Sequence, residues 1–382
     1  MMTAVAQQGL PDETITVYRA AGIVYRMATV DDNTVLQDIL RNNAMESWVR
    51  LTMEHEPDYF AAGQLFGESH TLLAHRENQP NEIVGMCAWT LLPGHVNGKT
   101  TITGYLGELR VQPAFRHRLS VIRNGFRAVQ QFSAAQSPPF WFTSIAGENL
   151  AAKRLLEAQL PGLPVYLPRG EMNTLAFPAY QCKSSSLWQA ATTADIPALV
   201  EFYNAQQQQW QFAPQLTSAW LQQLDGSNGL QLQDFYLLKR DGRITACVAL
   251  WDQRRFKQTV VRGYRFPLNL LRPIYNLYAG AAGRVSLPVA GKQIDYLFLA
   301  FLAVDESEQH LITNLIQEAL SLVKQRNVAL AMLGLAKDNP LLGKLIRQPH
   351  ELYVTTIDSV DWPGEAAAAL DNRPAQPEIA LL

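Results

Sequence analysis

Apolar and polar residues alternate along the first half of the chain with two periods, one typical of half-buried strands and one typical of amphipathic helices. The predicted strands are residues 24–28, 71–75, 83–91, 101–111, 140–145 and 173–177. The predicted helices are residues 35–40, 45–53, 119–132 and 149–160. This order predicts a mixed α/β fold, with an antiparallel front and a strand-helix-strand unit behind it.

The pattern of the first half returns, loosely, in the second half. Residues 28–36 (ATVDDNTVL) are similar to residues 191–199 (ATTADIPAL), so that Asp32 corresponds to Asp195. Farther along, Ala88 corresponds to Ala249 in two similar strand pairs. A repeat of this length is much longer than a solenoid unit of ~20–50 residues and indicates a tandem duplication of a whole domain.

The duplication divides the chain into two domains. The predicted ranges are residues 1–180 for the first domain and 187–363 for the second, with a polar linker between them. Residues 364–382 are rich in Ala, Pro and polar residues and are expected to be a disordered tail.

The second half contains an insertion at about residues 254–290. Val304 follows Ala249 by 304 − 249 = 55 positions, whereas Val111 follows Ala88 by 111 − 88 = 23. Basic and aromatic residues interleave here with an apolar, helix-like stretch, a composition that fits a membrane-surface or partner-docking element. We expect instead a lid packed on the protein; a membrane surface is the alternative that is not favoured, and RNA binding is weaker still.

Composition mainly argues against certain classes of protein and kinds of site. The 382 residues are 48% hydrophobic and carry a net charge of −2, which gives no general field for nucleic acid, so no nucleic-acid partner is expected. The three cysteines, Cys87, Cys182 and Cys247, are too scattered for a disulfide framework or a zinc site, and the histidines show no metal-ligand spacing. No signal peptide and no run of ~18 apolar residues is visible, so a cytoplasmic protein is expected.

Residues 107–118 (GELRVQPAFRHR) resemble the fourth strand and following loop of the GCN5-related N-acetyltransferases. Asn149, followed by Ala152 and Leu155, is similar to the downstream helix motif of that family. The second half has residues 302–305 (LAVD) at the strand position and Asn339, with Leu342 and Leu345, at the helix position. The resemblance implies two tandem domains of an acyl-CoA N-acyltransferase fold.

The resemblance also implies a coenzyme A site in which acetyl-CoA or another acyl-CoA is the cosubstrate and no metal takes part. The cofactor-binding residues carried over from the family are Leu109, Arg110, Val111, Arg116, His117, Arg118, Leu119, Ser120, Val121 and Asn149. The strand backbone would pair with the pantetheine amides, and the start of the following helix would bind the pyrophosphate.

The loop departs from the family pattern because its glycines are absent from both halves. In the second half, residues 305–308 (DESE) place three carboxylates where a pyrophosphate should lie. Like charges oppose binding, so the first half is expected to bind coenzyme A and the second to be a degenerate copy.

Glu108 is the candidate general base, because it lies on the strand beside the expected thioester. An amine of pKa ~10.4 costs about 4–5 kcal/mol to deprotonate at neutral pH. The alternative for Glu108 is a surface ion pair with Arg110. The family's usual tyrosine acid is replaced by Leu156, and Tyr166 is the candidate substitute, with a packed core tyrosine as its alternative.

The resulting hypothesis is transfer of an acetyl or other short acyl group to an amine of a small molecule or peptide. The alternative is a non-catalytic binding or scaffolding protein that kept the fold, associated with a membrane or partner through residues 254–278. The residues specify neither the acceptor nor the oligomeric state.

Overall fold

The structure is a computed structural model that describes residues 17–45, 47–181, 187–282, 284–363 and 369–382. The first half contains β1 (Val17–Ala20), β2 (Ile23–Met27), α1 (Asn33–Asn42), β3 (Val49–Glu54), β4 (Glu68–Arg76), β5 (Gln79–Val96), β6 (Lys99–Val111), α2 (Leu119–Ser133), β7 (Phe140–Ala146), α3 (Leu150–Leu156) and β8 (Val165–Pro178). The second half contains β9 (Gln189–Ala190), α4 (Ile196–Gln207), β10 (Ala213–Pro214), α5 (Ser218–Gln222), β11 (Phe235–Arg240), β12 (Arg243–Trp251), β13 (Gln258–Tyr264), α6 (Leu268–Ala282), β14 (Tyr296–Val304), α7 (Ile312–Gln325), β15 (Leu330–Ala336), α8 (Leu342–Leu345) and β16 (Glu351–Asp361). The predicted mixed α/β fold is confirmed.

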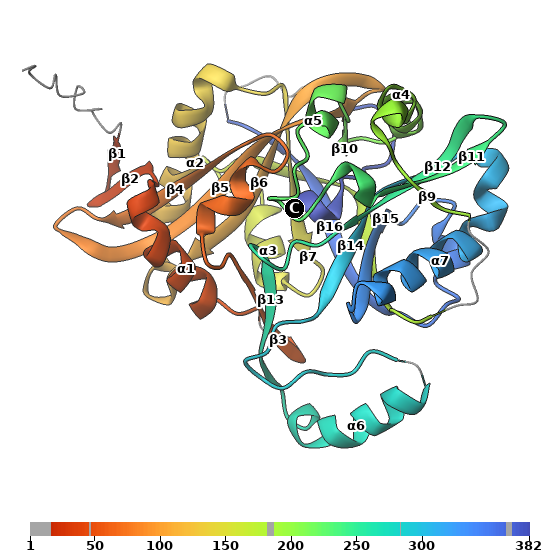
Figure 1. Cartoon of the computed structure of the whole chain (residues 1–382). Helices are drawn as coiled ribbons and strands as arrows, with labels where there is room; N and C mark the ends of the chain where they lie inside the picture. Colours follow the sequence, from red (N-terminus) through yellow and green to blue (C-terminus); the bar gives the residue numbers. More distant parts are fainter. Residues whose placement is uncertain (1–16, 46, 182–186, 283, 364–368) are drawn as a thin grey trace, which may run out of the picture.

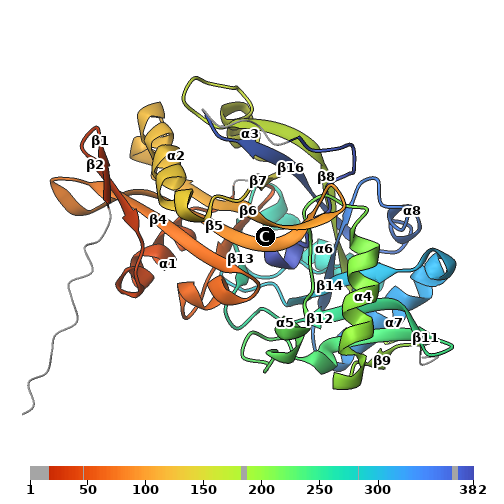
Figure 2. The ribbon, with the colours of Figure 1, turned by 90° about the horizontal axis from the view of Figure 1, so that it is seen from above.

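One large mixed sheet runs through both halves. Among the described residues it has 14 strands, thirteen of them in the order β1-β2-β4-β5-β6-β7-β16-β8-β15-β14-β12-β11-β9, with β10 attached to β5. Figure 2 shows α2 and α1 on opposite sides of the first-half strands, and Figure 1 shows α4 and α7 on opposite sides of the second-half strands. Helices on both faces bury the apolar side chains of each half.

The predicted duplication is visible in local geometry. Thr29 and Asp32 form a capping box before α1, and Thr192 and Asp195 form the same box before α4. In each box the aspartate carboxylate reaches back and accepts from both the amide and the hydroxyl of the threonine, which satisfies an amide that would otherwise lack a partner. The two aspartates are those aligned from the sequence.

The two halves exchange their last strands. β8, which ends the first half, pairs with β15 of the second half, while β16, which ends the second half, pairs with β7 of the first. β8 and β16 also pair with each other along eleven matched positions, at the centre of the sheet. The ladder hydrogen bonds of each half are therefore completed only by the other half.

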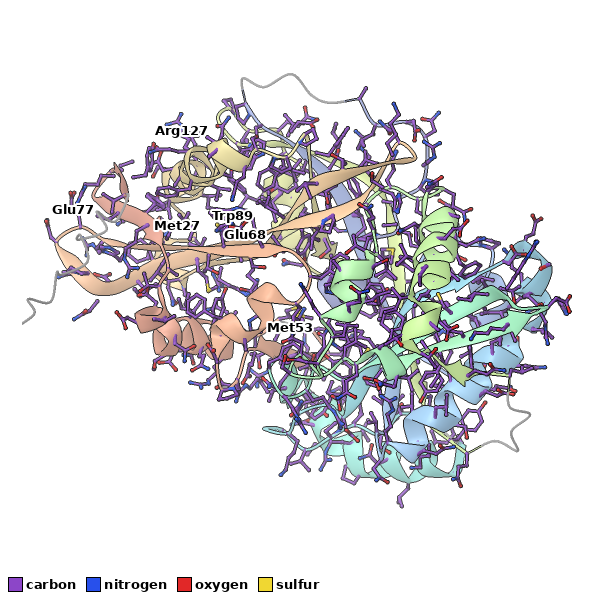
Figure 3. The ribbon with its side chains drawn as sticks, turned by 45° about the horizontal axis from the view of Figure 1, so that its top comes forward. Met27, Met53, Glu68, Glu77, Trp89 and Arg127 are labelled. Carbon is purple, nitrogen blue, oxygen red and sulfur yellow. The ribbon has the colours of Figure 1, made fainter. Side chains whose placement is uncertain are left out.

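The structure corrects the prediction of a helix at residues 45–53. Residues 49–54 form β3, which pairs with β13 in the insertion more than two hundred residues away. The buried residues of β3 are the polar Thr52 and Glu54, and both contact Arg262 of β13, whereas Met53 is exposed. Figure 3 labels Met53 near the place where the halves meet. An inward polar face removes the hydrophobic alternation that would have indicated a strand.

The predicted disordered tail is also corrected for the part that the structure describes. Residues 364–368 lie outside the described residues, but residues 369–382 are packed, with Ala375 and Ala380 buried. The side chain of Gln253 donates to the backbone oxygen of Ala380 at 2.8 Å. Figures 1 and 2 agree in showing the C-terminal end of the chain at the centre of the molecule.

Asp358 is a carboxylate buried in the middle of the sheet. It lies on β16 opposite Thr143 and Pro168, is fully inaccessible to solvent, and neither carboxyl oxygen has a hydrogen-bond partner among the described residues. Burial, and to a lesser degree the charge of Glu157, raises the pKa of this carboxyl group to about 6. A carboxyl whose pKa is raised in the folded protein destabilises it at every pH where the group is ionised.

Asp358→Asn is therefore expected to stabilise the protein in a pH-dependent way. The folded state binds the proton more tightly than the unfolded state, so the cost is absent near pH 4 and complete above about pH 6. The free energy of unfolding should rise by about 1–3 kcal/mol at pH 8 and by much less at pH 4, as measured by urea unfolding. The exposed Asp338→Asn is the matched control. An equal gain at both pH values would contradict this account.

Candidate active site

A β-bulge in β6 carries Glu108. Met86 of β5 lies opposite Arg110 and Ala88 lies opposite Gly107, so Glu108 and Leu109 together face the single residue Cys87. Glu108 has φ 52°, a left-handed conformation that is uncommon for a residue with a side chain. Bulges redirect side chains and often lie at functional sites. Here the bulge directs Glu108 toward the loop that follows β3.

Two side chains contact the carboxylate of Glu108, and a third holds one of them in place. The Tyr59 hydroxyl donates to Glu108 Oε2 at 2.5 Å, and His55 Nε2 lies 3.3 Å from Glu108 Oε1. Tyr59 Oη also lies 3.0 Å from Thr71 Oγ1. Because Tyr59 gives its only proton to Glu108, Thr71 is the donor in that second bond. The carboxylate is thus held in one orientation by a hydroxyl chain.

The protonation states around Glu108 follow from burial. Burial, followed by the charge of Glu108, raises the pKa of Tyr59 well above its ordinary value, so the phenol stays protonated. Burial lowers the pKa of His55, although the Glu108 charge opposes the shift, so the imidazole is neutral at pH 7. His55 Nδ1 is buried and has no hydrogen-bond partner among the described residues.

The second half contributes to the same site. Lys257, from the insertion, donates from Nζ to the backbone oxygen of Leu382 in the tail. Burial lowers the pKa of Lys257, and the charge of Glu108 raises it, which places the ammonium within electrostatic range of the carboxylate. The candidate active site therefore combines the first half, the insertion and the tail.

Beyond the bulge, β6 has an open edge. β6 and β7 pair in parallel only between residues 103–106 and 140–143, and no strand pairs with residues 107–111 on that side in the described structure. Backbone groups on such an edge need a ligand or water as partner. The geometry provides the extended strip of amides that the sequence resemblance implied.

An apolar hollow lies next to this edge, between the sheet and α2. It is half open to solvent, and the space between its walls and in the solvent at its mouth together amounts to ≈ 370 Å³. The residues that line it include Tyr25, Cys87, Leu109, Val111, Ile122 and Gly125. Burial raises the pKa of the Cys87 thiol to about 12, so this cysteine is neutral and inert. Leu109, Arg110, Val111 and Val121, predicted as cofactor residues, all line the hollow.

The loop before α2 presents cations at the start of a helix. Arg116, His117, Arg118 and Ser120 are exposed, and α2 begins at Leu119. Arg116 bonds back to the Val111 oxygen at 3.0 Å and to Asn43, while the Arg118 guanidinium lies over the Phe115 ring. First-turn amides lack partners within a helix, and the dipole favours an anion there. Arginines stand where the resembled family has glycines, and in this structure both side chains contact residues of the first half rather than the start of α2.

The second half has the same bulge in the same register, but its cleft is filled. Phe301 of β14 has φ 53°, and Val248 faces the bulge as Cys87 does in the first half. The Phe301 amide donates to Glu378 Oε2 at 2.7 Å, and the Ala336 amide donates to Gln376 Oε1 at 3.0 Å. The tail thus occupies the cleft between β14 and β15 that corresponds to the open edge of β6.

The acidic loop of the second half is closed on itself. Asp305 accepts from the Ser307 amide and hydroxyl, and Glu308 is paired with Arg240 at 3.0 Å. The backbone oxygen of Gln309 accepts a hydrogen bond from Lys344 Nζ at 2.9 Å. The carboxylates therefore take the place that an anion would need.

Two predicted residues lie away from Glu108. Tyr166 is buried in β8 with its ring against Phe126, and no hydrogen bond joins it to the candidate site in the described structure. Asn149 caps α3 by accepting from the Ala152 amide. Both roles stay predictions. His55 and Tyr59 were not predicted for this site, and within the described residues no group of three His, Cys, Asp or Glu side chains could hold a metal ion.

The whole chain is similar in structure to N-myristoyltransferase from Saccharomyces cerevisiae. A structure of that protein with bound myristoyl-CoA gives a TM-score of 0.58 at 12% sequence identity and covers 97% of this chain and 94% of that one. Another gives a TM-score of 0.60 at 11% identity, over 96% and 88%. A GCN5-related N-acetyltransferase from Anabaena variabilis gives 0.47 at 13% identity, over 88% and 72%.

No protein-family model matches the sequence, and no curated protein matches it. N-myristoyltransferases consist of two tandem domains of the GCN5-related N-acetyltransferase fold. The similarity over nearly the full length of both chains therefore confirms the predicted tandem fold.

Proposed function

We propose that the protein transfers an acyl group from an acyl-CoA to an amine, using the first half as its catalytic half. The observation that carries this proposal is the position of Glu108, on a bulge between an open strand edge with an apolar hollow and a loop that holds its carboxylate. The fold shared with structures that hold myristoyl-CoA supports the choice of donor.

In the proposed reaction the amine nitrogen attacks the thioester carbonyl carbon, a C–N bond forms and the C–S bond breaks. The proton of the amine passes to Glu108, and the leaving thiolate of coenzyme A takes up a proton. The Tyr59 hydroxyl and His55 hold the carboxylate toward the acceptor. Neutral His55, whose Nε2 lies 3.3 Å from Glu108 Oε1, donates from that nitrogen to the ionised carboxylate and so positions it.

The donor would lie along the open edge of β6. Its pantetheine amides would pair with the backbone of residues 109–111, and its acyl group would enter the apolar hollow. The pyrophosphate would lie at the start of α2, near Arg116 and Arg118. The acceptor, a small amine or a peptide amine, would approach Glu108 from the side of His55 and Lys257.

Titration calorimetry with acetyl-CoA and with longer acyl-CoAs tests the proposal. Arg116→Gln with Arg118→Gln should weaken binding by about tenfold or more, because two charges near the phosphates are lost. Gln309→Ala, at the corresponding loop of the second half, should leave the dissociation constant unchanged. Equal losses from both changes would show that the wrong half was chosen. No binding at millimolar ligand would favour the alternative, a non-catalytic scaffold.

Gly125 offers a separate test of the hollow as the acyl site. A Cβ on Gly125 would meet only Tyr25 at 3.7 Å, so alanine fits without strain, whereas leucine projects into the hollow. Gly125→Leu is expected to lower kcat/KM for the longest acyl-CoA used by about tenfold or more and to spare acetyl-CoA. Gly125→Ala is the control for the backbone. If Gly125→Leu lowered kcat/KM equally for acyl-CoAs of every acyl chain length, the acyl group would have to bind outside the hollow.

A further inference from the structure

The insertion is the most basic segment of the chain. Residues 253–294 contain no Asp or Glu, although the whole chain has a net charge of −2. The basic residues of this segment are Arg254, Arg255, Lys257, Arg262, Arg265, Arg272, Arg284 and Lys292. Such a local excess of positive charge contrasts with the rest of the protein.

The structure shows which of these cations are free to meet a partner. Arg254 is paired with Asp252 and Asp295, Arg262 with Glu54, and Lys257 with the tail. The remaining five have no carboxylate partner among the described residues, and they are Arg255, Arg265, Arg272, Arg284 and Lys292. All five except Arg272 are exposed.

α6 turns its apolar side chains outward. Its large apolar residues that are 49% to 78% exposed lie at helical spacing, namely Leu270, Leu271, Ile274, Leu277 and Tyr278, and Phe266 just before the helix is 71% exposed. The opposite face holds the helix in place: Arg272 and Asn276 donate to the Leu287 oxygen, and Ala279 is buried. A surface helix normally shows the reverse polarity.

The helix also lies at the periphery of the protein, where Tyr275 contacts Glu351 at the start of β16. Figure 1 shows α6 beyond the β13–β3 ribbon that connects it to the two halves. The predicted lid is thus only half correct, since β13 pairs with β3 while α6 covers no core. Trp48, at the start of that ribbon, is 57% exposed, and the Arg265 guanidinium lies over its ring.

We propose that α6 docks on an anionic membrane surface and lies in the plane of the interface. Apolar side chains would enter the acyl boundary, while Arg265, Arg284 and Lys292 would meet lipid phosphates. In the described part of the chain no helix is long and apolar enough to cross a bilayer.

The charges argue against the other occupants of this face. A second copy of the chain would place the same face against itself, bringing two sets of unpaired cations together, which like-charge repulsion opposes. A protein partner would need a matching acidic rim around an apolar centre. Lipid phosphates around an acyl layer provide that arrangement everywhere, and aromatic residues such as Trp48 and Tyr278 are typical of the interface.

Co-sedimentation of the full chain with vesicles tests the proposal. Binding is expected to vesicles of phosphatidylcholine mixed with phosphatidylglycerol, and to weaken by about tenfold or more in phosphatidylcholine alone or at high salt. Leu270→Ser with Ile274→Ser and Leu277→Ser should abolish binding. Arg265→Gln with Arg284→Gln and Lys292→Gln should weaken it on the order of a hundredfold, at about fivefold for each cation.

The matched control removes three exposed cations elsewhere, through Arg154→Gln, Arg243→Gln and Arg347→Gln, and should bind as the unchanged protein does. All substituted side chains lie on the surface, so thermal unfolding should be nearly unchanged. The proposal fails if the unchanged protein does not co-sediment with anionic vesicles, or if the serine variant still binds them. It also fails if the serine variant instead abolishes a concentration-dependent dimer, because the face would then belong to a second copy.

Discussion

Replacing Glu108 with glutamine is expected to lower kcat/KM for acyl transfer by about 10²–10⁴-fold, the range typical of a lost general base. Glutamine keeps the size of the side chain and can still accept from the Tyr59 hydroxyl, so the bulge and the acyl-CoA site should stay intact. The measurement is an initial-rate assay that detects free coenzyme A in the presence of an amine acceptor.

The pattern of losses distinguishes chemistry from binding. Calorimetry should give Glu108→Gln an acyl-CoA affinity within about threefold of the unchanged protein, since the carboxylate does not contact the donor phosphates. Glu82→Gln makes the same chemical change on an exposed strand and serves as the control. If Glu108→Gln retained more than about a tenth of the activity, another group would have to be the base.

Neither half is expected to fold when it is produced alone. Separate chains covering residues 1–181 and 187–382 each lack the strand that the other half lends, because β8 pairs with β15 and β16 pairs with β7. Each isolated sheet would expose long unpaired edges and the apolar faces around them, which promotes aggregation. Circular dichroism and thermal unfolding of the separate halves should show no cooperative transition.

Co-expression is the matched experiment. Two fragments made together can exchange the same strands and should yield a complex with nearly the unfolding temperature of the intact chain. Cooperative unfolding of either fragment by itself would contradict the conclusion that the ladders of each half are completed only by the other.

Local motifs made much of the fold predictable. The capping residues Asp32 and Asp195 and the strand landmarks Val111 and Val304 depend on neighbours close in sequence, so the duplication could be found without a structure. The equal register of the bulges at Glu108 and Phe301 agrees with the same alignment.

What could not be predicted depends on partners far apart in the sequence. β3 carries polar residues inward because Arg262 reaches them from the insertion. The tail is ordered because Gln376 and Glu378 meet amides that the second half leaves unpaired, and composition carries no sign of such a match. The sequence around His55 has no metal-ligand spacing and no motif, so nothing local indicates that its loop meets Glu108.

Because the halves exchange their last strands, a strand that belongs to one half by sequence lies in the sheet of the other half. β16 belongs by number to the second half, yet it borders β7 and so helps to shape the site around the first-half strands. A chimera of two homologues joined at the linker would therefore pair β8 and β16 with foreign sheets. A chimera that preserves the site must therefore take the first-half sheet and residues 351–361 from the same parent. It must likewise take the second-half sheet and residues 165–178 from the same parent.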